Sequence, residues 1–276
     1  MSSTQKENKM GTMPVGKLII NIGLPMILSM LVQAVYNIVD SIFVARISDT
    51  GQAGSAGTSA LIAVGMAFPF QMLLVAVGAG TGVGVNSVLS RALGEKDMET
   101  VKKAANNGIF LSVISAVVFF IIGRFFAGLL IRSQGGEGLA LKYGTQYLSI
   151  VCMFSIGVFM QFIFERLLQS TGKSFYSMIT QMTGAIINII LDPILIFGLF
   201  GFPELKVAGA AVATVFGQIV AACFALYLNL KKNHEIAIDL KGFRPDGHTI
   251  RKIYAVGIPT MIMQSIGSVM TYCMNK

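Results

Sequence analysis

Long apolar runs separated by short polar segments dominate this chain of 276 residues. A membrane-spanning helix needs about 20 mostly apolar residues. Six runs have that length, namely 18–45, 53–77, 105–131, 139–168, 175–200 and 207–230, and a seventh begins near residue 250. The pattern predicts an all-α membrane protein, a bundle of six transmembrane helices followed by the start of a seventh.

The second run continues into a glycine-rich stretch, Gly78-Ala-Gly-Thr-Gly-Val-Gly84, and then into an amphipathic tail. Its glycines stand at every second position. A phosphate-binding GxGxxG loop would need a third glycine where Val83 or Val85 stands. The spacing therefore indicates close packing against another helix in the membrane.

Composition supports a membrane protein, because only 12% of the residues are charged, against roughly 25% in soluble domains. The net charge of +8 could indicate a protein that binds nucleic acid. The basic residues, however, lie in short loops without interleaved aromatic residues. They fit topology control, with no nucleic-acid partner. Most lie on the side of the N-terminal arm, and the other side has only Arg46, Arg124, Arg132, Lys142 and Lys206. The N-terminus is therefore predicted to be cytoplasmic.

The cysteines and histidines give no sign of a catalytic or metal centre. Cys152, Cys223 and Cys273 are isolated in apolar sequence, and His234 and His248 lie in one polar loop. No nucleophile–base pattern is visible, so we expect neither an enzyme nor a bound cofactor.

Two acidic residues, Asp40 and Asp192, lie deep inside apolar runs. A carboxylate in hydrocarbon costs several kcal/mol, so it usually faces a cavity and carries ions, protons or substrate. Each belongs to a stripe at helical spacing, formed by Ser29, Gln33, Tyr36, Asn37 and Asp40 in the first run and by Gln181, Gly184, Asn188 and Asp192 in the fifth.

The helix rise of about 1.5 Å per residue estimates the depth of these groups. Asp40 lies about 34 Å above Lys17, and Asp192 about 28 Å above Lys173. Thr214, in the sixth run, lies about 12 Å below Lys206 at the outer end. The similar heights predict one shared site in the outer half of the bilayer. Separate hydrogen bonds between helices are the alternative.

Two close carboxylates in a low-dielectric cavity cannot both ionise cheaply. Such a pair can hold a proton, or it can be neutralised by Na⁺, with oxygens of asparagine and threonine completing the shell. Pro25, about four turns before Asp40, should loosen the first helix. Loading and unloading of the pair would then bias the bend of this helix.

Other polar groups leave two interpretations open. Glu165, one turn after Gln161, could snorkel at the cytoplasmic interface or line the cavity. Gln71 and several methionines could line a soft pocket, although ordinary packing is the alternative for each methionine. These are Met66, Met72, Met153, Met160 and Met178.

A short direct repeat relates the first and seventh runs. Gly23-Leu-Pro25 matches Gly257-Ile-Pro259, and Lys17 then matches Arg251. The copies are offset by six spans, an even number, so both copies have the same orientation, as in a parallel repeat. We therefore expect a fragment: one complete half of a longer protein with the first helix of the next.

The motifs resemble the multidrug and toxic compound extrusion (MATE) family, in its bacterial MepA-like branch. They are Gly23-Leu-Pro25, Val39-Asp-Ser-Ile-Phe43, Arg166-Leu-Leu-Gln-Ser-Thr-Gly172, Asn188-Ile-Ile-Leu-Asp-Pro193 and Gly209-Ala-Ala-Val-Ala-Thr214. The resemblance implies two six-helix lobes around a central cavity. It also implies export of organic, often cationic, compounds across the bacterial inner membrane in exchange for H⁺ or Na⁺.

The same resemblance implies an ion site, with H⁺ or Na⁺ held by Asp40, Asn188, Asp192 and Thr214. Tyr36 and Pro25 would be its partners in the first helix. The chain then divides into a cytoplasmic arm (1–16), an N-lobe (17–232), a cytoplasmic linker (233–250) and the truncated first helix of a C-lobe (251–276). Membrane lipid and that missing C-lobe are its expected partners.

Two other functions, a lipid flippase and a membrane-embedded enzyme, fit the sequence less well than an antiporter. A lipid-linked oligosaccharide flippase of related architecture usually needs basic cavity residues for pyrophosphate. No lysine or arginine lies in the middle of a span except Arg124, which is near an outer end. A membrane-embedded enzyme would need clustered histidine, cysteine or nucleophile–base groups, which the chain lacks.

Overall fold

A computed structural model describes residues 13–47, 55–236 and 243–274, with the side chains of 55–57 left out. The described part is helical, without strands. Its elements are α2 (Val15–Ala45), α3 (Ser55–Gly94), α4 (Met98–Phe125), α5 (Ala127–Ser133), α6 (Gly138–Met153), α7 (Ile156–Ser170), α8 (Ser174–Phe197), the 3₁₀ turn η1 (Leu199–Gly201), α9 (Val207–Lys232) and α10 (Gly247–Met274).

Six of these helices, α2, α3, α4, α8, α9 and α10, are long and apolar enough to cross a membrane. The pair α6 and α7 also passes as one span, with a bend of 46°. The seven runs in the sequence therefore correspond to seven spans when this bent pair is counted once. The all-α membrane fold predicted from the sequence is confirmed.

The fourth apolar run differs from the straight helix that its hydropathy suggests. It breaks after Met153, and α7 begins at Ile156. A Cβ atom on Gly157 would lie 2.8 Å from Cγ1 of Ile219 in α9, so the chain passes very close to α9 just after the break. Serine and glycine commonly occur where helices kink, and Ser155 and Gly157 stand here.

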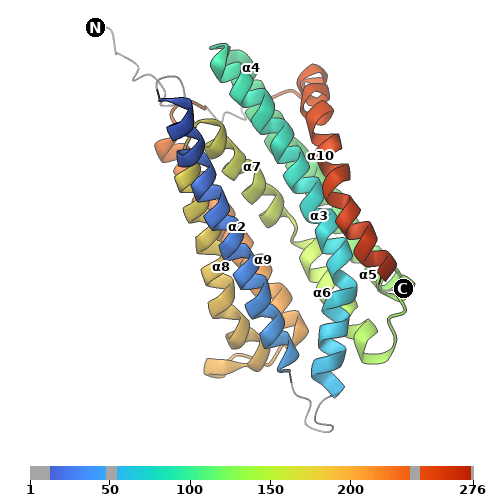
Figure 1. The fold of residues 1–276 in the computed structure, drawn as a ribbon. Coiled ribbons are helices and arrows are strands. Elements are labelled where there is room, and N and C mark those ends of the chain that lie inside the picture. Colours follow the sequence, from blue (N-terminus) through green and yellow to red (C-terminus); the bar gives the residue numbers. More distant parts are fainter. Residues whose placement is uncertain (1–12, 48–54, 237–242, 275–276) are drawn as a thin grey trace.

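Figure 1 shows the helices running alongside one another in a bundle. The strongest contacts of α2 are with α8, those of α8 are with α9, and those of α10 are with α3. Two apolar cores form, one including Val44, Leu74 and Ile131, and the other including Leu89 and Ile253. The helix positions place these cores toward opposite ends of the bundle.

The glycine-rich stretch of α3 forms the contact with α10. A Cβ atom on Gly84 would lie 2.2 Å from the carbonyl oxygen of Ile253, and one on Gly80 would lie 3.0 Å from that of Gly257. The absence of side chains lets the two backbones approach, as the glycine spacing predicted. Farther along the same pair of helices, the Ser268 hydroxyl donates to the carbonyl oxygen of Pro69.

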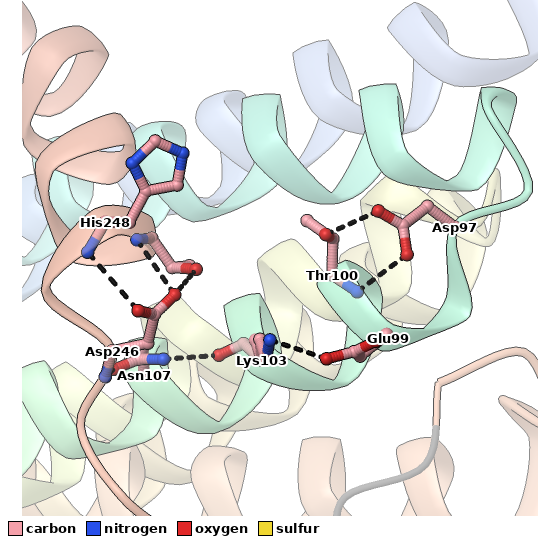
Figure 2. Close-up of polar contacts among 8 residues, drawn as sticks. Asp97, Glu99, Thr100, Lys103, Asn107, Asp246 and His248 are labelled. Carbon is pink, nitrogen blue, oxygen red and sulfur yellow. Dashed lines mark hydrogen bonds and ion pairs between the residues drawn. The ribbon is translucent and has the colours of Figure 1, made fainter.

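Hydrogen bonds attach the segment before α10 to α4 (Figure 2). The backbone N–H of Asp246 donates to Oδ1 of buried Asn107 at 3.1 Å. The Asp246 carboxylate accepts from the Thr249 hydroxyl and from its backbone N–H. These hydrogen bonds lower the pKa of Asp246 below its usual value, and the bond from the Thr249 hydroxyl has the largest effect. The carboxylate is therefore ionised at neutral pH and caps the N-terminus of α10.

The segment after α9 is attached as well. Lys173, which precedes α8, donates to Oδ1 of Asn233 at 3.2 Å and lies 3.7 Å from the Glu235 carboxylate. Asn233 in turn donates to the carbonyl oxygen of Leu167 at 3.1 Å. Both described ends of the segment between α9 and α10 are therefore bound to the bundle.

The contact between α3 and α10 gives a first prediction. Gly84→Ala places a methyl group against a backbone carbonyl, so we expect destabilisation by about 1–3 kcal/mol, as for overpacking. The measurement is thermal or denaturant unfolding of the purified protein in detergent. Gly65→Ala in the same helix is the matched control, since a Cβ there meets no atom within 4 Å. Equal stability of the two variants would contradict the assigned packing.

Candidate ion site in a polar cavity

A polar cavity of about 130 Å³ lies between α2, α3, α6, α7, α8 and α9. Its lining includes Gln33, Tyr36, Asn37, Asp40, Ser41, Gln71, Met72, Tyr147, Gln161, Gln181, Asn188, Thr214 and Gln218. No lysine, arginine or histidine of the described residues lines it. Pockets that bind organic ligands usually have volumes of roughly 300–1,000 Å³. This cavity is smaller, so it has room for several water molecules or an ion rather than for a drug-sized molecule.

Asn188 joins α8 to α9 at one side of this cavity. Its neighbours orient the amide: the nitrogen donates to Oδ2 of Asp192 at 3.0 Å, and the oxygen accepts from the backbone N–H of Thr214 at 3.0 Å and from its hydroxyl at 3.2 Å. Asp192 is fully buried, and Asn188 and Thr214 are buried beside it. Asn188 and Asp192, one turn apart on α8, and Thr214 of α9 therefore form one hydrogen-bonded cluster.

The close approach of α8 and α9 makes this cluster possible. A Cβ atom on Gly217 would lie 2.7 Å from the carbonyl oxygen of Gly184 and 3.5 Å from Cβ of Asn188. Two glycines that face each other let the helix backbones touch. Thr214, one turn before Gly217, is thereby brought within hydrogen-bond distance of Asn188.

Asp40 reaches the cavity from α2 and is bonded differently. Its side chain is buried, and among the described residues its Oδ1 has no hydrogen-bond partner. It lines the cavity beside Tyr36 and Asn37, and it is near enough to Asp192 for the two carboxylates to interact electrostatically. A buried acceptor without a protein partner has free capacity to bond a proton, a cation or a water molecule.

Two glutamines connect the helices that carry the acids. The amide of Gln181 in α8 donates to Oε1 of Gln33 in α2 at 3.2 Å. Both glutamines line the cavity. The polar stripes predicted on the first and fifth runs therefore face each other.

Other sequence expectations need correction. Glu165 does not snorkel, since it is 4% exposed and accepts from the Gln161 amide at 2.9 Å. It does not line the cavity either, although Gln161 does. Pro25 lies outside the cavity lining and borders a separate groove with Lys17. The distance along α2 explains this, because about four turns separate Pro25 from Asp40.

The wall of the cavity formed by α3 and α6 contains one polar residue that the sequence analysis named, Gln71, and one that it did not, Tyr147. Tyr147 of α6 lines the cavity and donates to Oε1 of Gln71 at 3.2 Å. Of the methionines named from the sequence, Met72 lines the cavity and the others do not. Tyr143 and Tyr147 stand one turn apart in the fourth run, and this spacing was the signal available for a polar helix face.

The fold and the cavity define a multi-pass membrane protein with buried acidic groups between its helices. A family model described as MatE matches residues 25–194, more than half of the chain. The chain belongs to this family, as its motifs suggested.

Individual proteins similar to this chain are described as members of the same family or as multidrug exporters. The multidrug export protein MepA of Staphylococcus aureus (strain bovine RF122 / ET3-1) is 27% identical over 250 residues, which cover 91% of this chain and 53% of that protein. Among solved structures, an outward-facing multidrug resistance MATE family transporter superposes with a TM-score of 0.84 at 29% identity. An inward-facing one gives 0.79 at 29% identity.

These structural matches cover 95% and 92% of this chain, and 56% and 55% of the matched chains. The chain thus spans about half the length of the relatives it matches.

Proposed function

We propose that this chain forms the first lobe of a secondary active antiporter that exports organic, often cationic, compounds in exchange for H⁺ or Na⁺. The observation that carries the proposal is the buried cluster of Asp192, Asn188 and Thr214 beside the partner-free carboxylate oxygen of Asp40. Buried ionisable groups in membrane helices usually serve ion or proton pathways. The relatives described as multidrug exporters support this direction.

In this proposal the coupling ion binds at the carboxylates. Asp40 supplies the open acceptor, and Asp192 supplies a second negative charge that Asn188 holds in position. A proton on either carboxylate removes the repulsion between the two charges, and Na⁺ bound between them does the same. The residues present fit both ions, since carboxylate, amide and hydroxyl oxygens are ligands of hard cations.

The drug site is a different place in this proposal. The cavity of about 130 Å³ is smaller than the roughly 300–1,000 Å³ of typical organic-ligand pockets. We infer that the exported compound binds between this lobe and the second one. Asp40 is the one carboxylate in the lining of the polar cavity, and no basic side chain of the described residues lines it, which gives no support to a flippase that binds pyrophosphate.

Binding or release of the coupling ion can alter the position of α2. This helix makes its strongest contacts with α8, and Gln33 and Gln181 bridge the pair. A proton or ion that changes the charge around Asp40 therefore changes the stability of the contact between α2 and α8. Pro25 removes one backbone hydrogen bond from α2, which lowers the cost of bending it. We place the N-terminus in the cytoplasm, following the distribution of basic residues.

The carboxylates give the second prediction. Asp192→Asn and Asp40→Asn keep the size of the side chain but remove the charge, so each should abolish ethidium efflux by the complete two-lobe protein. The measurement is efflux from cells, with membrane levels of the variants determined in parallel. Ser41→Ala is the control, because Ser41 lines the same cavity but its hydroxyl donates to the carbonyl oxygen of Asn37 in its own helix. Normal efflux in both asparagine variants at normal membrane levels would refute the ion site.

The coupling ion gives the third prediction. Reconstituted vesicles of the complete protein should export dye when a proton gradient or a sodium gradient is imposed alone, and the effective gradient identifies the ion. Asp192→Asn should remove the response to whichever ion is effective. Dye export that persists after both gradients are collapsed would contradict antiport.

A further inference from the structure

An amphipathic groove lies on the outside of the bundle between the first half of α2 and the beginning of α8. Its cavity volume is about 470 Å³, and it is separate from the polar cavity. Its walls are Leu24 and Leu28 from α2 and Phe175 and Met178 from α8, with buried Pro25 among its lining residues.

The polar residues of this groove are confined to one end. Lys17 and Asn21 stand one turn apart near the beginning of α2, and both are exposed. Among the described residues Lys17 forms no ion pair with a carboxylate. The groove therefore has a cationic end followed by an apolar length.

The dimensions match one leaflet of a bilayer. Lys17 and Leu28 are eleven positions apart, which corresponds to about 16 Å at the helical rise. Half of a hydrocarbon core of about 30 Å is about 15 Å. A molecule with its head at Lys17 and its tail along Leu24 and Leu28 would thus extend from the membrane surface to the midplane.

We propose that this groove binds an anionic phospholipid, with the phosphate group at Lys17 and Asn21 and one acyl chain along Leu24, Leu28, Phe175 and Met178. An ammonium group near the membrane surface attracts anionic lipid, and the amide of Asn21 can donate to a phosphate oxygen. The bound lipid touches both α2 and α8, the helices that carry Asp40 and Asp192. It therefore holds the ends of these two helices together.

The absence of tryptophan from the chain makes a direct test simple. Phe175 is 57% exposed and lines the groove, so Phe175→Trp places a single fluorophore at the lipid. Lipids with brominated acyl chains quench tryptophan on contact. The variant of the full chain is reconstituted into bilayers containing increasing fractions of brominated phosphatidylglycerol, or of brominated phosphatidylcholine as the neutral lipid.

We expect phosphatidylglycerol to be preferred over phosphatidylcholine by about five-fold, the factor that corresponds to about 1 kcal/mol for one lysine near the surface. Lys17→Ala should reduce this preference to about one, whereas Lys17→Arg should retain it. High salt should weaken it, because exposed charges are screened. None of these readouts requires transport, so they are independent of the antiport proposal.

The matched control is Phe216→Trp in α9, since Phe216 is 50% exposed and lines none of the grooves described. Its quenching should be the same with both lipids. Equal quenching by both lipids at position 175, or an unchanged preference in Lys17→Ala, would overturn the proposal. Quenching by neither lipid there would overturn it too, because the groove would then be closed to lipid.

Discussion

The cost of a buried carboxylate is the constraint on which this bundle depends. Asp192 is fully buried in α8, where an ionised side chain without partners would be strongly disfavoured. Asn188 meets this cost by donating to Asp192, and Thr214 fixes Asn188 by donating to its oxygen. Those contacts require α8 and α9 to touch, which Gly184 and Gly217 permit. The site and the helix packing are therefore one arrangement.

The two acids are unequal, and this difference bears on the proposed coupling. The neighbours of Asp192 hold it in place, whereas Asp40 has a buried oxygen without a protein partner among the described residues. Asp40 also belongs to α2, the span least buried within the bundle. A helix with few neighbours can shift at lower cost than a central one. The acid with free bonding capacity thus lies on the helix best able to respond to a bound proton or ion.

The sequence predicted much of this fold, because a membrane imposes simple rules. Apolar length identified the spans, and helical spacing placed Asp40 with Gln33 and Asp192 with Asn188. Rise per residue gave Thr214 a similar depth, and the structure brings Thr214 and Asn188 into contact.

What the sequence did not predict depends on contacts between distant segments. The break after Met153 lies within a continuous apolar run, so hydropathy has no signal for it. Glu165 stands beside Arg166 near a helix end, which suggests exposure, yet the packing of the bundle around α7 buries it. Tyr147 lines the cavity only because α6 packs against α3. A single sequence contains the side chains but not these neighbours.

The helices α2 and α8 meet at two levels, so the proposed lipid would restrict how α2 moves relative to α8. Gln33 and Gln181 connect them beside the cavity, and the groove lies between them nearer the start of α2. Pro25 itself lines the groove, about two turns before Gln33, and the backbone hydrogen bond that it lacks makes bending easiest there. A lipid that fixes the end of α2 leaves the bend as its main freedom. Charge changes at Asp40 would then bend the helix instead of displacing it as a rigid rod.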